Sequence, residues 1–218
     1  MFGYEINNSD SSTFHFYIIS FLIALCSMFI KMPQIRNILH AKKAKSVSLR
    51  AILTETCGHS IVLVYHFAMN YPFTSYSEYI FLVPQDLILL CILLYYNDRF
   101  DMRVVTGFMV YFFSCIFLAS GVISNAVLKI AIILATPISF FSKSLQIYSL
   151  HQSKDVGQLS FTTWLATTVC STARLLTSLY ETGDHVVSMN FLCSILLNIV
   201  IMVQIVYYNW VNRKEKLP

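Results

Sequence analysis

Charged residues are scarce in this chain. They make up 12% of its 218 residues, whereas hydrophobic residues make up 56% and the mean hydropathy is +0.64. An average soluble domain carries about twice that fraction of charge. The composition therefore excludes an ordinary soluble domain and predicts a polytopic membrane protein. Residues 1–13 contain no Lys or Arg, so they do not resemble a cleaved signal peptide.

The chain also lacks a Cys-x-x-Cys motif. Its cysteines all fall in apolar runs, where free cysteine behaves as a small hydrophobic residue, so we expect no disulfide. No nucleophile–base pair or metal-ligand set stands out, so neither an enzyme nor a cofactor is expected. The net charge of +4 comes from residues at membrane flanks rather than from one patch, which argues against a nucleic-acid partner.

Seven apolar segments are long enough to cross a membrane, which takes about 20 residues. They lie at 14–39, 48–70, 76–97, 103–122, 125–150, 160–181 and 186–210. The connections between them are short, which leaves no room for a separate soluble domain.

Positive residues lie on one side of this arrangement. Lys and Arg occupy the loops after the first, third and fifth segments and the C-terminal tail, whereas the N-terminal tail and the other loops have none. Positive residues collect on the cytosolic side of membranes. The pattern predicts a lumenal N-terminus and a cytosolic C-terminus.

The sequence repeats itself at an offset of 112 residues. Lys31, Gln34 and Ile35 return as Lys143, Gln146 and Ile147. Because the first and fifth segments enter from the same side, the repeats are parallel. We expect an all-α integral membrane protein with two three-helix bundles, at 14–97 and 125–211, joined by a linker helix at 98–124. The tails are 1–13 and 212–218.

Polar residues inside spans are costly and usually face the bundle interior. Several occupy equivalent positions in the two repeats: Glu55 and Thr167, His59 and Ser171, His66 and Ser178, Glu78 and Asn190, Asp86 and Asn198. Arg174 is added in the second repeat.

These positions predict a polar cavity between the repeats. We expect Asp86 and Asn198 to face each other near the midplane, with Arg174 as the counter-ion of Asp86. Glu55, His59 and Ser171 would also contact a solute, and Asp86 or Glu55 would carry a coupling proton. In the alternative interpretation, Asp86–Arg174 is a structural ion pair and the histidines are hydrogen-bonded interior residues.

Other polar residues have more ordinary interpretations. Glu55, His59 and His66 are spread too far along their segment to favour a metal site. We expect Lys31 and Lys143 to extend to the cytosolic boundary. Pro33 and Pro137 are expected to bend their helices, and Pro84 to open the helix beside Asp86.

Pro33-Gln34 at the end of the first segment, the degenerate Leu145-Gln146 of the fifth and the three-plus-one-plus-three layout resemble the PQ-loop membrane proteins. Lys31-Met-Pro-Gln-Ile and Ala44-Lys-Ser-Val-Ser-Leu49 resemble solute carrier family 66. The wider group includes a lysosomal cystine exporter, the SWEET sugar transporters and a protein of dolichol-linked mannose use. The resemblance implies a hinge at Pro33, Gln34 and Gln146, substrate contacts from the third and seventh helices, and a homo-oligomer.

Three functions remain open at this point. The first is a facilitator or proton-coupled transporter of a small polar solute, surrounded by membrane lipids. The second is a non-transporting helper in dolichol-linked sugar utilisation, which would hold a lipid-linked solute, and the third is a receptor for a peptide tail. The tail Lys214-Glu-Lys-Leu-Pro218 resembles a dilysine signal for retrieval-coat recognition, which favours the endoplasmic reticulum over the lysosome or another endomembrane.

Overall fold

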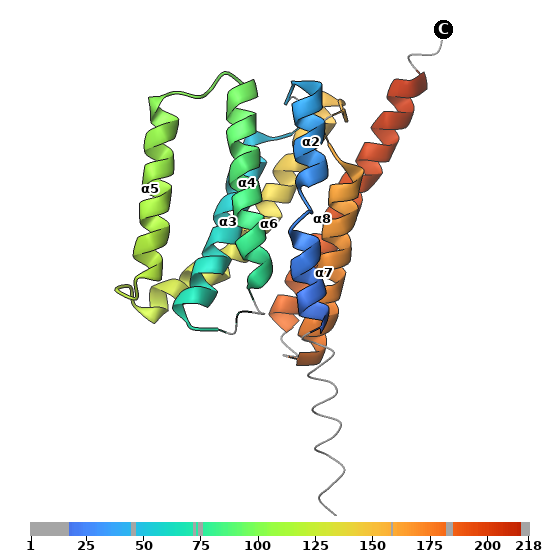
Figure 1. Ribbon diagram of the computed structural model, residues 1–218. Coiled ribbons are helices and arrows are strands. Elements are labelled where there is room, and N and C mark those ends of the chain that lie inside the picture. Colours follow the sequence, from blue (N-terminus) through green and yellow to red (C-terminus); the bar gives the residue numbers. More distant parts are fainter. Residues whose placement is uncertain are drawn as a thin grey trace, which may run out of the picture.

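The protein is a bundle of helices, shown by a computed structural model (Figure 1). The structure describes residues 18–44, 47–71, 73, 76–157, 159–181 and 185–214. The predicted tail 1–13 and residues 215–218 of the predicted tail 212–218, which include Lys216 of the retrieval signal, lie outside the described residues; residues 212–214 belong to α8.

Helical residues 18–27 begin the described chain, and seven labelled helices follow. These are α2 (Met32–Ala41), α3 (Leu49–Ala68), α4 (Ser77–Tyr96), α5 (Met102–Ala119), α6 (Asn125–Ser153), α7 (Phe161–Glu181) and α8 (His185–Lys214). Residues 18–27 and α2 together form the first predicted span, so the seven-helix prediction is confirmed, with ends that differ by a few residues.

The first span is broken just before its Pro-Gln pair. Residues 28–31 form turns, and Pro33 lies in the first turn of α2, where a missing N–H costs nothing. Gln85 of α4 bridges the break. Its Oε1 accepts from the Lys31 backbone N at 3.1 Å and its Nε2 donates to the Ser27 carbonyl at 2.8 Å. One side chain thus satisfies two of the groups that the break releases.

Pro84 and Pro137 do not interrupt their helices. Pro84 lies inside a continuous α4, and Pro137 inside a continuous α6. The expectation that Pro84 opens its helix is therefore wrong. α6 also runs unbroken through Gln146, with Leu145 at the position equivalent to Pro33.

The 112-residue repeat is visible in the backbone. Lys42 and Lys154 both end their helices in the left-handed conformation, and their N–H groups donate to Ile38 and Leu150. The Ser48 hydroxyl caps α3 by accepting from the Ala51 N–H at 3.2 Å. Its equivalent, Ser160, accepts from the Thr163 N–H at 3.3 Å at the start of α7. The repeat is therefore one of local geometry as well as of sequence.

The apolar core has the same symmetry and lies toward one end of the bundle. Its buried residues include six pairs 112 apart: Ile38 and Leu150, Ala44 and Val156, Val47 and Leu159, Ile52 and Trp164, Leu89 and Ile201, Leu93 and Ile205. They come from both repeats, at the end where α2 finishes (Figure 1). This apolar cluster therefore joins the two repeats at the end predicted to be cytosolic.

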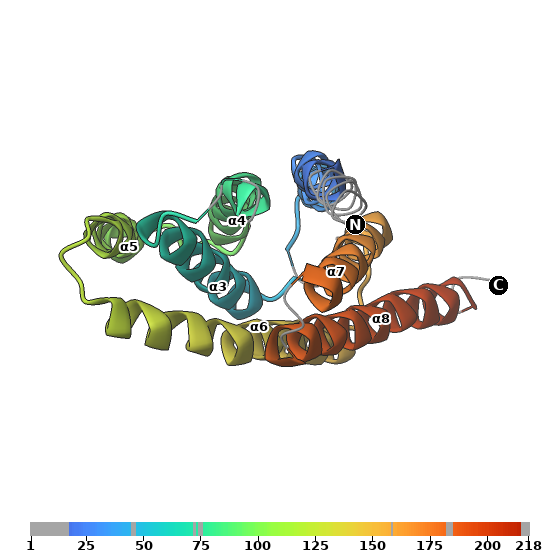
Figure 2. The ribbon, with the colours of Figure 1, turned by 90° about the horizontal axis from the view of Figure 1, so that it is seen from below.

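The outer surface is apolar, as contact with lipid requires. Within the described residues, five helical segments are long and apolar enough to cross a membrane: Ile18–Ala41, Ser77–Tyr96, Met102–Ala119, Asn125–Ser153 and Ser188–Asn212. The remaining two, α3 and α7, carry many of the predicted site residues. α3 packs mainly on α6 and α7 on α8, and α5 stands at the edge of the bundle (Figure 2).

Candidate functional site

A small cavity lies between the two repeats. It encloses about 20 Å³, room for about one water molecule. Ten of its eleven lining residues form five pairs that are 112 positions apart: Lys31 and Lys143, Gln34 and Gln146, Ala51 and Thr163, Ile52 and Trp164, Glu55 and Thr167. Ser142 completes the lining. Equivalent positions of both repeats thus meet at one point, as they would around a two-fold pseudo-axis.

Lys31 is the centre of the charged network at this cavity. Its Nζ lies 2.8 Å from Glu55 Oε2 and forms an ion pair with Asp86 Oδ1. Lys31 is 5% exposed and Asp86 is 0% exposed. The expectation that Lys31 extends to the membrane boundary is therefore wrong. The two carboxylates offset part of the cost of removing the Lys31 ammonium from water.

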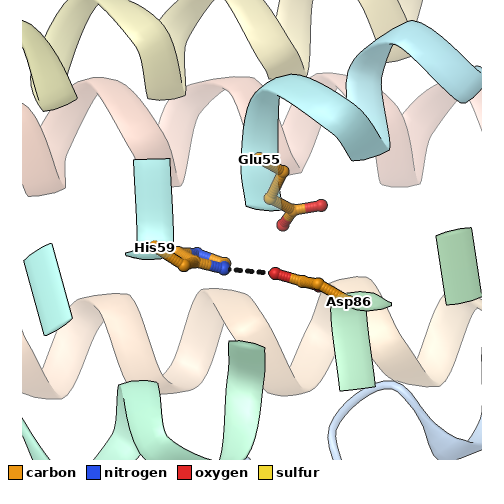
Figure 3. Close-up of side chains that lie close together, drawn as sticks. All are labelled: Glu55, His59 and Asp86. Atoms are coloured by element: carbon orange, nitrogen blue, oxygen red, sulfur yellow. Dashed lines mark hydrogen bonds and ion pairs between the residues drawn. The ribbon is translucent and has the colours of Figure 1, made fainter. Parts of the chain in front are cut away.

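His59 completes the network from α3. Its Nδ1 lies 2.6 Å from Asp86 Oδ2, and Glu55 projects toward the same space one helical turn away (Figure 3). The sequence prediction that Glu55, His59 and Asp86 gather in one place agrees with this geometry. The contact of His59 also agrees with the alternative of a hydrogen-bonded interior histidine.

These three side chains also have the spacing of a metal-ligand group. One ligand atom from each of Glu55, His59 and Asp86 lies within 4.8 Å of the others. However, the Lys31 ammonium already contacts both carboxylates. A divalent ion there would have to displace it or bear its repulsion. We therefore interpret the group as an ion-pair network.

Arg174 has a different partner from the one predicted. Its Nε donates to Glu78 Oε2 at 3.1 Å, linking α7 to α4. The predicted pairing of Arg174 with Asp86 is wrong, because Asp86 forms an ion pair with Lys31 and a hydrogen bond with His59 instead. The Arg174–Glu78 pair joins the two repeats on the opposite side of the cavity from the apolar cluster.

Asn198 is fully buried on α8, and within the described residues neither its Nδ2 nor its Oδ1 has a hydrogen-bond partner. The predicted Asp86–Asn198 pair is therefore not hydrogen-bonded. Ser171 is half-buried on α7. Of the predicted hinge residues, Gln34 and Gln146 line the cavity, and Gln146 Oε1 accepts from the Ser48 backbone N at 3.1 Å.

Sequence reasoning missed the roles of Lys31, Gln85 and Lys143 at this site. The Nζ of Lys143 turns inward and donates to Ser194 at 3.2 Å and to Ser139 at 3.4 Å. The 112-residue spacing of Lys31 and Lys143 could have indicated these interior roles. Lysines that only reach the membrane boundary have no reason to recur at equivalent positions of the two repeats.

Residues 16–75 and 127–187 match the family model of the PQ loop repeat. The chain belongs to the PQ-loop repeat family. It is 30% identical over 179 residues to human solute carrier family 66 member 3, across 82% of this chain and 87% of that protein. The predicted resemblance to PQ-loop proteins of solute carrier family 66 is thereby confirmed.

The fold is that of a known transporter. The structure of a eukaryotic SWEET transporter superposes with a TM-score of 0.54, at 16% identity, over 89% of this chain and 98% of that one. This likeness confirms the predicted two-repeat, seven-helix fold. Family and fold together indicate a multi-pass membrane protein of the transporter type, and both relatives are named as carriers or transporters rather than as enzymes.

Proposed function

We propose that this chain moves a small polar solute across a membrane by alternating access, with Asp86 or Glu55 carrying a coupling proton. The observation that supports this most is the cavity lined by five pairs of equivalent residues. A site on a pseudo-axis between two bundles can be opened to either side by rocking one bundle against the other.

Two separate contacts between the repeats would act as the gates. On one side of the cavity the apolar cluster holds the bundles together, and on the other side the Arg174–Glu78 pair does so. Both are closed in this structure, and the cavity has room for only about one water. The described conformation therefore corresponds to an occluded state of the cycle.

The charged network offers a route from protonation to movement. Lys31 lies in the break of the first span, so the ion pairs that hold it also hold the hinge at Pro33 and Gln34. Protonation of Asp86 would remove one of the two negative charges that fix Lys31. The freed hinge could then change its angle, which would couple proton binding to rocking.

We also propose that the chain resides in the endoplasmic reticulum with a lumenal N-terminus. The distribution of Lys and Arg and the C-terminal lysines support this. Replacing Lys214 and Lys216 with Ser should release a tagged protein to later compartments, as seen by microscopy and protease protection. Retention of that variant would remove the retrieval signal from the proposal.

The test of alternating access does not require the solute to be known. Thr167, which lines the cavity, is replaced with Cys in a chain whose six native cysteines are replaced with Ala. In proteoliposomes, a membrane-impermeant thiol reagent is then added from either side at two pH values. A transporter should be labelled from both sides, in a pH-dependent ratio that Asp86→Asn abolishes.

A matched control uses Val203→Cys on α8, whose native side chain is 61% exposed on the surface expected to face lipid. This thiol should react from neither side, because thiols in hydrocarbon do not form the reactive thiolate. Labelling of Thr167→Cys from one side only, at every pH, would contradict alternating access. That result would favour a receptor or a helper in dolichol-linked sugar utilisation.

A further inference from the structure

The two repeats place opposite kinds of residue around their equivalent lysines. In the first repeat, Lys31 contacts the carboxylates of Glu55 and Asp86. At the equivalent positions around Lys143, the second repeat has Thr167 and Asn198. At the positions equivalent to Glu55 and Asp86, the second repeat therefore carries a neutral hydroxyl and a neutral amide.

Lys143 has no carboxylate partner among the residues that the structure describes. Its hydrogen-bond partners are two serine hydroxyls, Ser194 at 3.2 Å and Ser139 at 3.4 Å. Glu55 lines the same cavity, but its Oε2 lies 2.8 Å from Lys31. Hydroxyl groups solvate an ammonium without cancelling its charge, and an uncompensated charge inside a membrane is unfavourable.

Asn198 supplies an independent observation. Its side chain is 0% exposed, and both its amide nitrogen and its amide oxygen are without partners in the described part of the chain. It lies four residues after Ser194, which places both on one face of α8. Buried polar groups are normally paired, so an unpaired amide at this depth points to a function such as ligand binding.

We propose that Lys143 and Asn198 bind a carboxylate group of the transported solute. The solute would supply, in the second repeat, the negative charge that Asp86 supplies in the first. One carboxylate oxygen would accept from Lys143 Nζ and the other from Asn198 Nδ2, as a two-oxygen group can. A dianion fits less well, because Glu55 lines the same cavity.

This inference rests on the proposed transport function and names the class of its substrate, a small monocarboxylate. Since the cavity is closed here, the solute enters when the bundles separate. The Lys143 contacts with Ser139 and Ser194 then give way to contacts with the solute.

The first test measures thermal unfolding of the full chain in nanodiscs with added lactate. The midpoint should rise with lactate concentration and should stay unchanged with lactamide, which has the same shape without the charge. Lys143→Met should weaken lactate binding at least tenfold. An equal rise with chloride would assign the site to inorganic anions, and no rise with lactate would leave no carboxylate site; either result overturns the proposal.

The second test needs no ligand. Asn198→Asp restores the acid that the first repeat has at this position and places a carboxylate where the solute's would bind. We expect this variant to unfold at a higher temperature and to lose its response to lactate. Asn190→Asp, eight residues earlier on α8, is the matched control and should not gain stability.

A lower unfolding midpoint for Asn198→Asp would overturn the inference. It would show that the new carboxylate is buried without a cation beside it, so that Lys143 does not reach this position. The outcome is separable from that of the transport proposal. If Thr167→Cys is labelled from both sides while lactate has no effect, alternating access stands and the carboxylate site fails. If lactate binds while labelling is one-sided, the site stands and transport fails.

Discussion

Replacing Lys31 with Met should be among the most damaging single changes to this protein. Lys31 is the cation that Glu55 and the fully buried Asp86 share. Met has a similar length but no charge, so the variant leaves two carboxylates close together with only His59 beside them. Removal of one partner from a buried ion pair costs about 3–5 kcal/mol. We expect a loss of that size in the free energy of unfolding.

Replacing Asp86 with Asn should cost less, although Asp86 is the more deeply buried residue. Lys31 keeps Glu55 at 2.8 Å, so no charge is left alone. The loss is then that of hydrogen bonds to a charged group, about 1.5–3 kcal/mol. Lys31→Met should therefore lose more free energy of unfolding than Asp86→Asn, because one lysine is shared between two acids.

The assay is reversible unfolding in mixed detergent micelles, for both single variants and for the double variant Lys31→Met/Asp86→Asn. Contacting residues show coupling energies of about 0.5–3 kcal/mol, so the double variant should lose less than the sum of the single losses. Phe113→Ala, whose native side chain is 65% exposed on α5, is the control and should change little.

Acidification should reduce the cost of Lys31→Met, because protonation removes the charge that the substitution leaves unpaired. Additive single losses, or a larger loss for Asp86→Asn than for Lys31→Met, would refute the interpretation of Lys31 as the shared cation.

Three further changes test the packing that holds the site, each by the same unfolding assay. Leu93→Ala, in the apolar cluster and 0% exposed, should cost about 2–5 kcal/mol, and a loss no larger than that of Phe113→Ala would contradict the gate's packing. Gln85→Leu leaves two backbone groups of the broken span unpaired and should cost about 1–3 kcal/mol for each; an unchanged stability would mean that the break needs no bridge. Ser48→Ala removes the cap of α3 and should cost about 1 kcal/mol, which a wild-type midpoint would disprove.

The helices and the repeat could be predicted because both depend on short-range patterns. A span needs a fixed length of apolar residues, so its position can be read directly from the sequence. The offset of 112 needs no structural knowledge either. It correctly places the Ser48 and Ser160 caps and the Lys42 and Lys154 helix ends at equivalent positions.

The partners of the buried charges could not be predicted in the same way. Glu78 and Asp86 are eight residues apart on α4, about 12 Å along the axis. Estimated depth placed Arg174 beside Asp86, although it contacts Glu78. An error of two turns in depth or a modest rotation of α7 is enough to exchange one acid for the other. Neither quantity is encoded locally.

The break in the first span explains why Lys31 in particular was misplaced. On a continuous helix, Lys31 would lie eight residues, about 12 Å, before the predicted end at residue 39, and no local pattern in the sequence gives it a partner. In the structure α2 continues to Ala41, and the turn at 28–31 places Lys31 beside α3 and α4. The Pro-Gln pair is therefore linked to more than a bend in the helix. The turn just before it places the Lys31 ammonium against Glu55 and Asp86.

The two repeats share a backbone but divide the polar chemistry between them. The first has the break, the bridging Gln85 and the acids. The second has an unbroken α6, Leu197 at the position equivalent to Gln85, and a lysine without an acid. Because only the first repeat contains both a hinge and titratable carboxylates, we expect it to bend on protonation while the second moves as a rigid body. An asymmetric division of this kind would let proton binding and solute binding act on one cavity from opposite repeats.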